Sequence, residues 1–415
     1  MNPSVPAELD PVELARVASG PVPDPDVVDQ IGAAGPGGRR ATRRLLRVVL
    51  DADPRWTGRL RFDAFRRAVT LDGKPLRDAD LTRMSCWVEE VYQAAPSRDL
   101  LFEVASCVAE DHAFHPVRDW LDGLVWDGVE RAPSLLARML GAAPTPLHAE
   151  MGRAFLVGAV ARVFEPGVKL DTMLVLVGKQ GIGKSQVCRA LVPEASWFSD
   201  TPLDLRSKDA YQALHGKWIV EHAEMESVRG RSATRVKSFL SSATDSFRAP
   251  YARAPEDHPR QCVFIGTPNH PELFDDGSGS RRFWPVQVSW VQPQAVAAWR
   301  DQLWAEAVVR YRRGERWHLD AAAEAERATA AERFHITDPV RERMAAWLHR
   351  TKGPFSTAEA LSEGLGVGVE AIDRSLQTRI GLLLHELGCS KFRLRRSLGG
   401  AWRWEPPPIG PQGAT

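Results

Sequence analysis

Two residues, Lys184 and Ser185, stand where the chain could bind the phosphates of a nucleotide. They end the pattern G-x-x-x-x-G-K-S, which begins at Gly178 and follows an apolar run from Met173 to Val177. The run predicts a buried strand and the residues after Ser185 a helix, which is the setting in which this motif binds phosphate. Its glycines allow backbone N–H groups to surround a phosphate at a helix N-terminus. The sequence therefore predicts a nucleoside triphosphate site.

The positions of this motif have separate expected roles. We expect Lys184 to reach the β- and γ-phosphates and Ser185 to hold Mg²⁺. The other residues of the expected nucleotide site are Gly178, Gly181, Gly183 and Gln186. The alternative is a glycine-rich turn that only looks like a phosphate loop. The strand, the helix and the three key positions favour phosphate binding.

Hydrolysis would also need a carboxylate beside the metal ion. The segment from Lys217 to Glu226 begins with apolar residues and ends in three acids, as a Walker-B segment does. Glu224 is the first choice for the acid that contacts hydrated Mg²⁺ or orients the attacking water. Glu221 and Glu226 are the runners-up. An acidic strand end that only caps the next helix is the alternative.

Two later segments contain residues that would respond to the γ-phosphate. Asn269 follows an apolar strand and is expected at the carboxyl edge of the sheet, where α/β sheets bind ligands. It fits a sensor, and a structural asparagine that caps the next turn is the competing interpretation. Arg281 and Arg282 precede another apolar strand and fit an arginine finger for a neighbouring subunit's site. A solvated or DNA-facing arginine pair is the alternative.

Basic and aromatic residues also alternate between the acid strand and Asn269. Lys237, Arg248 and Arg253 supply positive charge, and Phe247 and Tyr251 lie among them in the sequence. This combination is typical of proteins that follow a single-stranded backbone and stack bases. Taken alone the pattern is weak, because short basic and aromatic loops are common.

Other notable residues have simpler interpretations. Arg39, Arg40, Arg43 and Arg44 open a predicted helix and form either a solvated face or a phosphate contact. His115 is expected to be a structural histidine, and the tryptophans near it are expected to pack helices.

Composition limits the possible partners and location. The 54 basic and 53 acidic residues nearly cancel, so any nucleic-acid contact must come from local patches. The five cysteines form no C-x-x-C pair, which argues against a zinc site or a disulfide framework and fits a reducing cytoplasm. No apolar run approaches the roughly 20 residues of a membrane span. We expect a soluble cytoplasmic protein with no membrane contact.

Strands and helices alternate in the middle of the chain, which predicts an α/β fold with a parallel sheet. The candidate strands are 173–177, 218–223, 261–267 and 283–288. The length of 415 residues allows two or three domains. The expected parts are a disordered leader (1–38, with one short helix at 12–18), a helical domain (39–164), a P-loop core (165–290), a helical extension (291–350), a winged-helix-like domain (351–405) and a flexible tail (406–415).

Taken together, these segments resemble the virulence-associated protein E family. That family is itself similar to the superfamily 3 helicases and to the helicase halves of phage and plasmid primase–helicases. The matching segments lie in order across residues 114–288: FHPVRDWLDGLVWDGVER, GKQGIGKS, GKWIVEHAEME, KSFLSSATDSFRAPYAR, FIGTPN and GSRRFWPV. The ordered set is far more specific than any of its members.

The resemblance implies an AAA+-like core that uses ATP and Mg²⁺ and serves the replication of mobile genetic elements. It supports Glu224 as the Walker-B acid, Asn269 as the sensor and Arg281 or Arg282 as the finger, and it implies a hairpin near Lys237 that grips DNA in a ring pore. The acids are spaced as Glu221 and Glu224 rather than as an adjacent Asp-Glu pair, which leaves their roles open. The chain also lacks room for a fused primase domain, so priming would need a separate protein.

The leading hypothesis is an ATP-driven DNA helicase or translocase, expected to form a hexameric ring on single-stranded or forked DNA of a phage, plasmid or genomic island. The alternative is an ATP-regulated DNA-binding initiator or regulator that does not unwind DNA. A small-molecule P-loop kinase is a third class, which the arginine pair and Asn269 disfavour.

Overall fold

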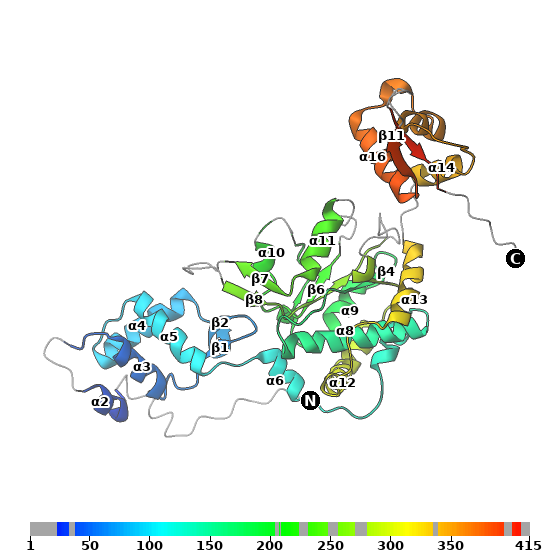
Figure 1. Cartoon of the computed structure of the whole chain (residues 1–415). Coiled ribbons are helices and arrows are strands. Elements are labelled where there is room, and N and C mark those ends of the chain that lie inside the picture. The colour runs from blue at the N-terminus through cyan, green and yellow to red at the C-terminus, as the bar shows by residue number, and fades with distance from the viewer. Residues whose placement is uncertain are drawn as a thin grey trace. The chain divides into compact units, whose positions relative to one another are not determined.

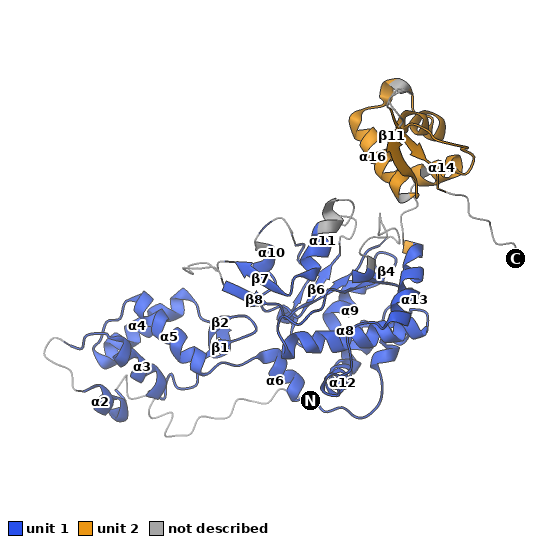
Figure 2. Ribbon diagram, in the orientation of Figure 1, with its two compact units in different colours: residues 1–271, 277–333 blue, residues 272–276, 334–415 orange. Residues whose placement is uncertain are grey.

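The computed structural model describes residues 23–32, 38–203, 207, 209–223, 231–247, 256–269, 280–334, 339–393 and 401–407. The chain divides into two compact units, residues 1–271 with 277–333 and residues 272–276 with 334–415 (Figure 2). Figure 1 labels their helices and strands.

The larger unit begins with a helical layer that has its own apolar core. Its helices are α2 (Pro25–Ile31), α3 (Arg43–Ala52), α4 (Asp78–Tyr92) and α5 (Arg98–Asp111). Three short antiparallel strands lie between them, β1 (Leu60–Asp63), β2 (Ala68–Leu71) and β3 (Lys74–Pro75). The sequence predicted only helices and a turn here. Asp72 and Gly73 both adopt positive φ, 53° and 74°, which is the geometry of a tight hairpin turn.

The segment 1–38, predicted to be a disordered leader, contains an ordered helix. The Asp24 side chain caps α2 by accepting the backbone N–H of Asp26, and Pro25 takes the first helical position. Val27 is fully buried in the core that α3, α4 and α5 share. These contacts with distant residues order residues 25–31, which lie in a segment whose composition indicated disorder. The short helix expected at 12–18 lies outside the described residues.

A five-stranded parallel sheet forms the centre of the larger unit, which confirms the predicted α/β class. The strand order is β10–β4–β9–β6–β5. The strands are β4 (Met173–Val177), β5 (Phe198–Ser199), β6 (Ile219–His222), β9 (Val263–Gly266) and β10 (Phe283–Gln287). All five residues of β4 are buried, as expected for a central strand covered on both faces. The sequence predicted four of these strands and missed β5, which has only two residues.

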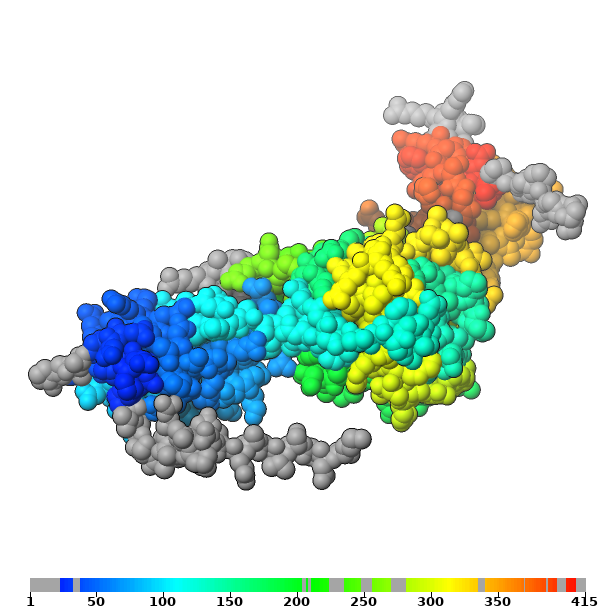
Figure 3. Space-filling model, turned by 90° about the horizontal axis from the view of Figure 1, so that it is seen from below, coloured from blue at the N-terminus to red at the C-terminus, as the bar shows by residue number. Residues whose placement is uncertain are grey.

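Helices cover the sheet. They are α6 (Pro116–Asp122), α7 (Leu135–Leu140), α8 (Pro146–Phe164), α9 (Lys184–Ala190), α10 (Asp209–Gln212), α11 (Arg231–Ser241), α12 (Pro293–Arg312) and α13 (Ala321–Ala331). α8 packs against α12 and α13, and Figure 3 shows the teal surface of the α8 region beside the yellow surface of α12 and α13. An antiparallel pair, β7 (Thr244–Phe247) and β8 (Glu256–Pro259), lies apart from the main sheet.

The core of the sheet includes residues on both sides of the expected domain boundary at 164. Leu156 and Val160 of α8 share one apolar cluster with Leu174 of β4. α8, the last helix of the expected helical domain, therefore belongs to the core of the sheet and not to the core of α2–α5.

The smaller unit contains α14 (Pro339–Leu348), α15 (Thr357–Glu359), α16 (Arg374–Glu386) and the antiparallel pair β11 (Ser390–Arg393) and β12 (Trp402–Glu405). Met344 and Trp347 of α14 lie in its core with Leu361, Leu384 and Trp404. α14 lies within the expected extension 291–350 but belongs to this unit, because its apolar face packs here. The winged-helix assignment stays a prediction.

None of the described helices is long and apolar enough to cross a membrane.

Candidate nucleotide site

The turn between β4 and α9, residues 178–183, is called here the glycine-rich turn. Gly183 caps α9 with φ +97°, a conformation that side chains other than glycine rarely adopt. At Gly178, a Cβ atom would stand 2.6 Å from the carbonyl oxygen of Val288. Glycine is therefore required at 183 by the backbone conformation and at 178 by the close approach of the chain after β10. The strand, the turn and the helix that the sequence predicts are all present here.

Lys184 begins α9 and is buried, with its ammonium group turned toward the glycine-rich turn. Its Nζ donates to the carbonyl oxygens of Gly178 at 2.6 Å and Lys179 at 3.0 Å, and to Asn269 Oδ1 at 3.0 Å. Burial lowers the pKa of Lys184 from its usual value, while the nearby Glu221 carboxylate opposes this shift. All three acceptors are neutral, so a phosphate bound in the turn would supply the missing negative charge.

Glu221 lies on β6 and is only 2 % exposed. Its Oε1 accepts hydrogen bonds from Ser185 Oγ at 2.6 Å and from Thr267 Oγ1 at 2.5 Å. Its Oε2 is also buried but has no hydrogen-bond partner among the described residues. A buried carboxylate oxygen without a partner is costly, and a cation would satisfy it.

The hydroxyl of Ser185 and the carboxylate of Glu221 are hard oxygen ligands, the kind that Mg²⁺ prefers. Magnesium sites of nucleotide enzymes commonly use one or two protein ligands and complete the shell with phosphates and water. In the part of the chain that the structure describes, no group of three or more His, Cys, Asp or Glu could hold a metal ion alone. The residues present therefore fit Mg²⁺ that arrives with a nucleotide.

The acid in contact with Ser185 is thus Glu221, a runner-up in the sequence analysis. Glu224, the first choice, and Glu226 lie outside the described residues. β9 lies between β4 and β6, so these two strands are not neighbours. Thr267, just after β9, donates its hydroxyl to the same oxygen of Glu221 that Ser185 contacts. The sequence analysis did not single out Thr267, although its place two residues before Asn269 was a usable signal.

Asn269 follows β9 at the carboxyl edge of the sheet, as expected. Its side-chain oxygen contacts Lys184, so it lies at the point where a sensor of bound phosphate would stand. Its response to the γ-phosphate stays a prediction.

Arg281 and Arg282 lie at the opposite edge of the sheet. They form a short helical turn (Ser280–Arg282) just before β10, whose first residue pairs with the first residue of β4. The length of β4, about 16 Å at 3.3 Å per residue, separates that edge from the glycine-rich turn. Arg282 Nε donates to Ser241 Oγ at 2.7 Å, whereas Arg281 is exposed. Their position therefore disfavours a role at the glycine-rich turn of their own chain.

Most of the candidate DNA contacts lie in the connection between β7 and β8. Arg248, Tyr251 and Arg253 are outside the described residues, and Lys237 is half-buried on α11. Phe247 is buried and packs against His258 with ring centroids 4.3 Å apart. The suggestion that Phe247 stacks bases is therefore wrong, because its ring belongs to the protein interior.

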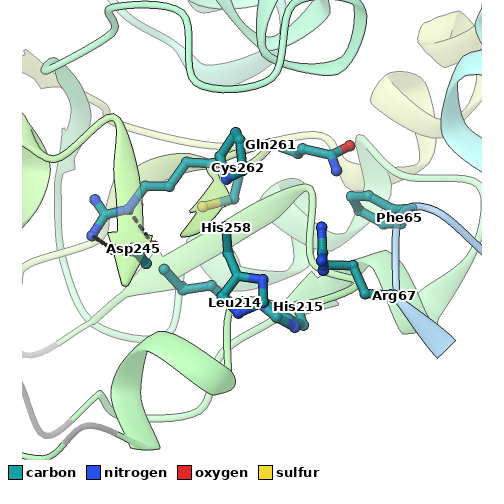
Figure 4. A pocket seen from close by; sticks show the side chains of 10 residues that line it. Phe65, Arg67, Leu214, His215, Asp245, His258, Gln261 and Cys262 are labelled. Atoms are coloured by element: carbon teal, nitrogen blue, oxygen red, sulfur yellow. Dashed lines mark hydrogen bonds and ion pairs between the residues drawn. The ribbon is translucent and has the colours of Figure 1, made fainter. Parts of the chain in front are cut away.

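A small pocket near β7 and β8 is not a second nucleotide site. It has a volume of about 30 Å³ and is lined by residues that include Arg67, His215, His258 and Cys262 (Figure 4). That volume holds about one water molecule. Burial, with a contribution from His258, lowers the pKa of His215 to about 4.

His115 is structural, as the sequence predicts. Its Nδ1 accepts the backbone N–H of Arg118 and so caps α6, while Nε2 lies 2.5 Å from Gln261 Oε1. Burial lowers the pKa of His115, which favours the neutral ring that this pair of contacts requires.

Comparison with known proteins gives a family. The family model for the virulence-associated protein E-like domain matches residues 121–336, more than half of the chain. A search of curated proteins found no match. Three apo structures of the NrS-1 C-terminal region are similar to this chain. The first has 13% identity over 83% of this chain and 95% of the other, with a TM-score of 0.48.

The second has 12% identity over 84% of this chain and 96% of the other, with a TM-score of 0.49. The third has 13% identity over 83% of this chain and 95% of the other, with a TM-score of 0.42. The match of the family model agrees with the resemblance of the ordered motifs. The chain therefore belongs to the virulence-associated protein E-like family.

Proposed function

We propose that this protein is a Mg²⁺-dependent ATPase that acts on DNA during replication of a mobile genetic element. The observation that carries the proposal is the convergence of four side chains from three strand ends. Lys184 contacts Asn269, and Ser185 contacts Glu221, which has a buried oxygen without a partner among the described residues. Membership of the family supports the role in replication.

The chain's own residues would divide the work of binding and hydrolysis. Backbone N–H groups of the glycine-rich turn would bind the phosphates, and Lys184 would exchange its carbonyl partners for phosphate oxygens. Ser185 and Glu221 would hold Mg²⁺, which neutralises charge that develops on the phosphates. Asn269, released from Lys184, would hydrogen-bond the γ-phosphate or its attacking water. Glu224 stays the proposed residue that orients this water.

We further propose that the site is completed by a neighbouring subunit. Arg281 is exposed at the sheet edge opposite the glycine-rich turn, so it is suited to reach a nucleotide held by another copy. Arg282 is the weaker choice, because Ser241 and Asp171 of its own chain hold it. A closed ring, with six members as the expected number, gives every site such an arginine.

The partner in this proposal is single-stranded or forked DNA, gripped by the connection between β7 and β8. A buried ion pair holds the base of these strands, because Arg260 contacts both carboxylate oxygens of Asp245 at 2.7 Å. A firm base would transmit movement to Arg248, Tyr251 and Arg253. A helicase or translocase needs such mechanical coupling between ATP hydrolysis and the residues that contact DNA.

One observation favours a second candidate, an ATP-regulated DNA-binding initiator without unwinding activity. In the smaller unit, Trp402 is 57% exposed and Lys391 Nζ lies 5.4 Å from the centre of its ring. An exposed aromatic ring beside a cation is suited to nucleic acid. Strand displacement on a forked duplex separates the candidates, because only the helicase displaces a strand.

The test of the leading proposal measures ATPase activity with and without single-stranded DNA. It also measures the mass of the protein assembly in the presence of a slowly hydrolysed ATP analogue. We expect DNA to stimulate turnover and the analogue to assemble a ring. Unstimulated turnover from a persistent monomer would contradict the helicase proposal.

A further inference from the structure

The segment that follows β10, residues 288–292, forms a wall beside the glycine-rich turn. The backbone N–H of Val288 donates to Val177 at 2.8 Å, which continues the pairing of β10 with β4. Val291 Cγ2 lies 3.1 Å from the point where a Cβ on Gly183 would stand. The wall is therefore in contact with the backbone that would hold the phosphates.

The same segment is fastened on its other side to the turn between α7 and α8. Ser289 Oγ donates to the carbonyl oxygen of Gly141 at 2.8 Å, and the N–H of Gln292 donates to Met139 at 2.9 Å. Hydrogen bonds on either side of Trp290 thus hold its backbone in place.

Trp290 rests on Gly141. Gly141 has φ +60°, and a Cβ there would stand 2.7 Å from Trp290 Nε1 and 2.8 Å from Cδ1. Glycine lets the indole approach the backbone this closely. The Trp290 residue nevertheless remains 43% exposed. An indole supported on one side and open on the other, one residue from a contact with the glycine-rich turn, is placed to receive a flat ligand.

We propose that the indole of Trp290 is the platform on which the base of the bound nucleotide stacks. This inference rests on the proposed nucleotide site. It concerns the base of the nucleotide, which the proposed phosphate contacts do not recognise. Stacking accepts any base, because every base has a π-face. Purines present a larger face than pyrimidines, so the expected ligand class is the purine nucleoside triphosphates.

The test compares two ligands that share phosphates and differ in the base. Binding of Mg·ATP and of inorganic Mg·tripolyphosphate is measured with the full chain and with Trp290→Ala. We expect ATP to bind about 10-fold more weakly to the variant, since stacking on an aromatic side chain typically contributes this much. Tripolyphosphate should bind both proteins equally.

Two further variants distinguish stacking from a change in structure. Trp290→Phe keeps an aromatic face and should retain most of the ATP affinity. Phe102→Ala removes another exposed aromatic ring, 49% exposed on α5, and should change neither ligand. Unaltered ATP binding in Trp290→Ala would overturn the inference, and so would an equal loss of both ligands, which indicates a displaced turn.

Failure of the proposed site gives a different result. The nucleotide site itself is wrong if Lys184→Ala binds each ligand as tightly as the wild-type chain does, or if neither protein binds either ligand. The stacking platform would then be wrong as well. If Lys184→Ala loses both ligands and Trp290→Ala loses neither, only the platform is wrong.

Discussion

The two edges of the parallel sheet carry polar groups in different states. At the carboxyl edge, Lys184, Glu221 and Thr267 are buried. Thr267 donates a hydrogen bond to Glu221, and Lys184 donates one to Asn269. At the amino edge, Arg281 is exposed and Arg282 is held by Ser241. One edge therefore buries polar groups that contact one another, while the other presents a charge outward.

The amino edge also contains groups that are kept neutral or paired. His215 precedes β6, and the buried Arg260 precedes β9 and pairs with Asp245. Both carboxylate oxygens of Asp245 accept hydrogen bonds from Arg260, whereas Glu221 has a buried oxygen without a partner among the described residues.

The largest expected effect is at the carboxyl edge. Lys184→Ala removes the only ammonium that contacts Asn269 among the described residues, and we expect ATP hydrolysis to fall by at least about 100-fold. Steady-state phosphate release measures this change. Lys74→Ala, an exposed lysine on β3, is the matched control and should hydrolyse ATP normally. Unchanged turnover in Lys184→Ala would show that the site is misassigned.

The second effect tests whether the amino edge works on a neighbour. Arg281→Ala should bind ATP as the wild type does and lose on the order of 10³ in turnover, as loss of an arginine finger does. Arg282→Ala should lose less, because that side chain already has partners in its own chain.

Mixing sharpens this prediction. Arg281→Ala and Lys184→Ala proteins, each inactive alone, should regain activity together, because one supplies the intact turn and the other the intact arginine. A mixture as inactive as its components would contradict a shared site.

A smaller effect is expected at Thr267, a positioning residue for the acid. Thr267→Val keeps the shape of the side chain and removes the hydroxyl that holds Glu221 Oε1. We expect the Mg²⁺ concentration for half-maximal activity to rise about 10-fold, as for other groups that orient a metal ligand. Thr267→Ser should restore the wild-type Mg²⁺ dependence. A fall in activity with no change in that dependence would indicate a purely structural role.

The smallest effect concerns stability at the amino edge. The pKa of His215 is lowered to about 4, so the folded protein keeps this ring neutral while the unfolded chain protonates it near its ordinary pKa of about 6.5. Acidification from pH 7 toward 4 should therefore lower the free energy of unfolding. Thermal unfolding of the wild type and of His215→Gln measures this, and the variant should lose less stability with acid. Identical pH profiles would exclude His215 as a source.

Much of the site could be predicted from the sequence, because the motif and the strand and helix beside it are adjacent in the chain. The strand from Met173, the turn and the helix from Lys184 follow from residues adjacent in the chain. Less of the helical layer could be predicted in this way. The hairpin at Asp72 and Gly73 was interpreted only as a turn. The helix α2 was missed because Val27 packs in a core formed by residues far away in the sequence.

By itself, the sequence determined the α/β class, the position of the glycine-rich turn and the family, because periodicity, glycine spacing and ordered motifs are properties of neighbouring residues. Tertiary structure alone decided that Glu221 is the acid at Ser185, that Thr267 supports it and that the arginines lie at the far edge. Strand order is the physical reason. β9 enters between β4 and β6, and that placement depends on packing between segments far apart in the chain.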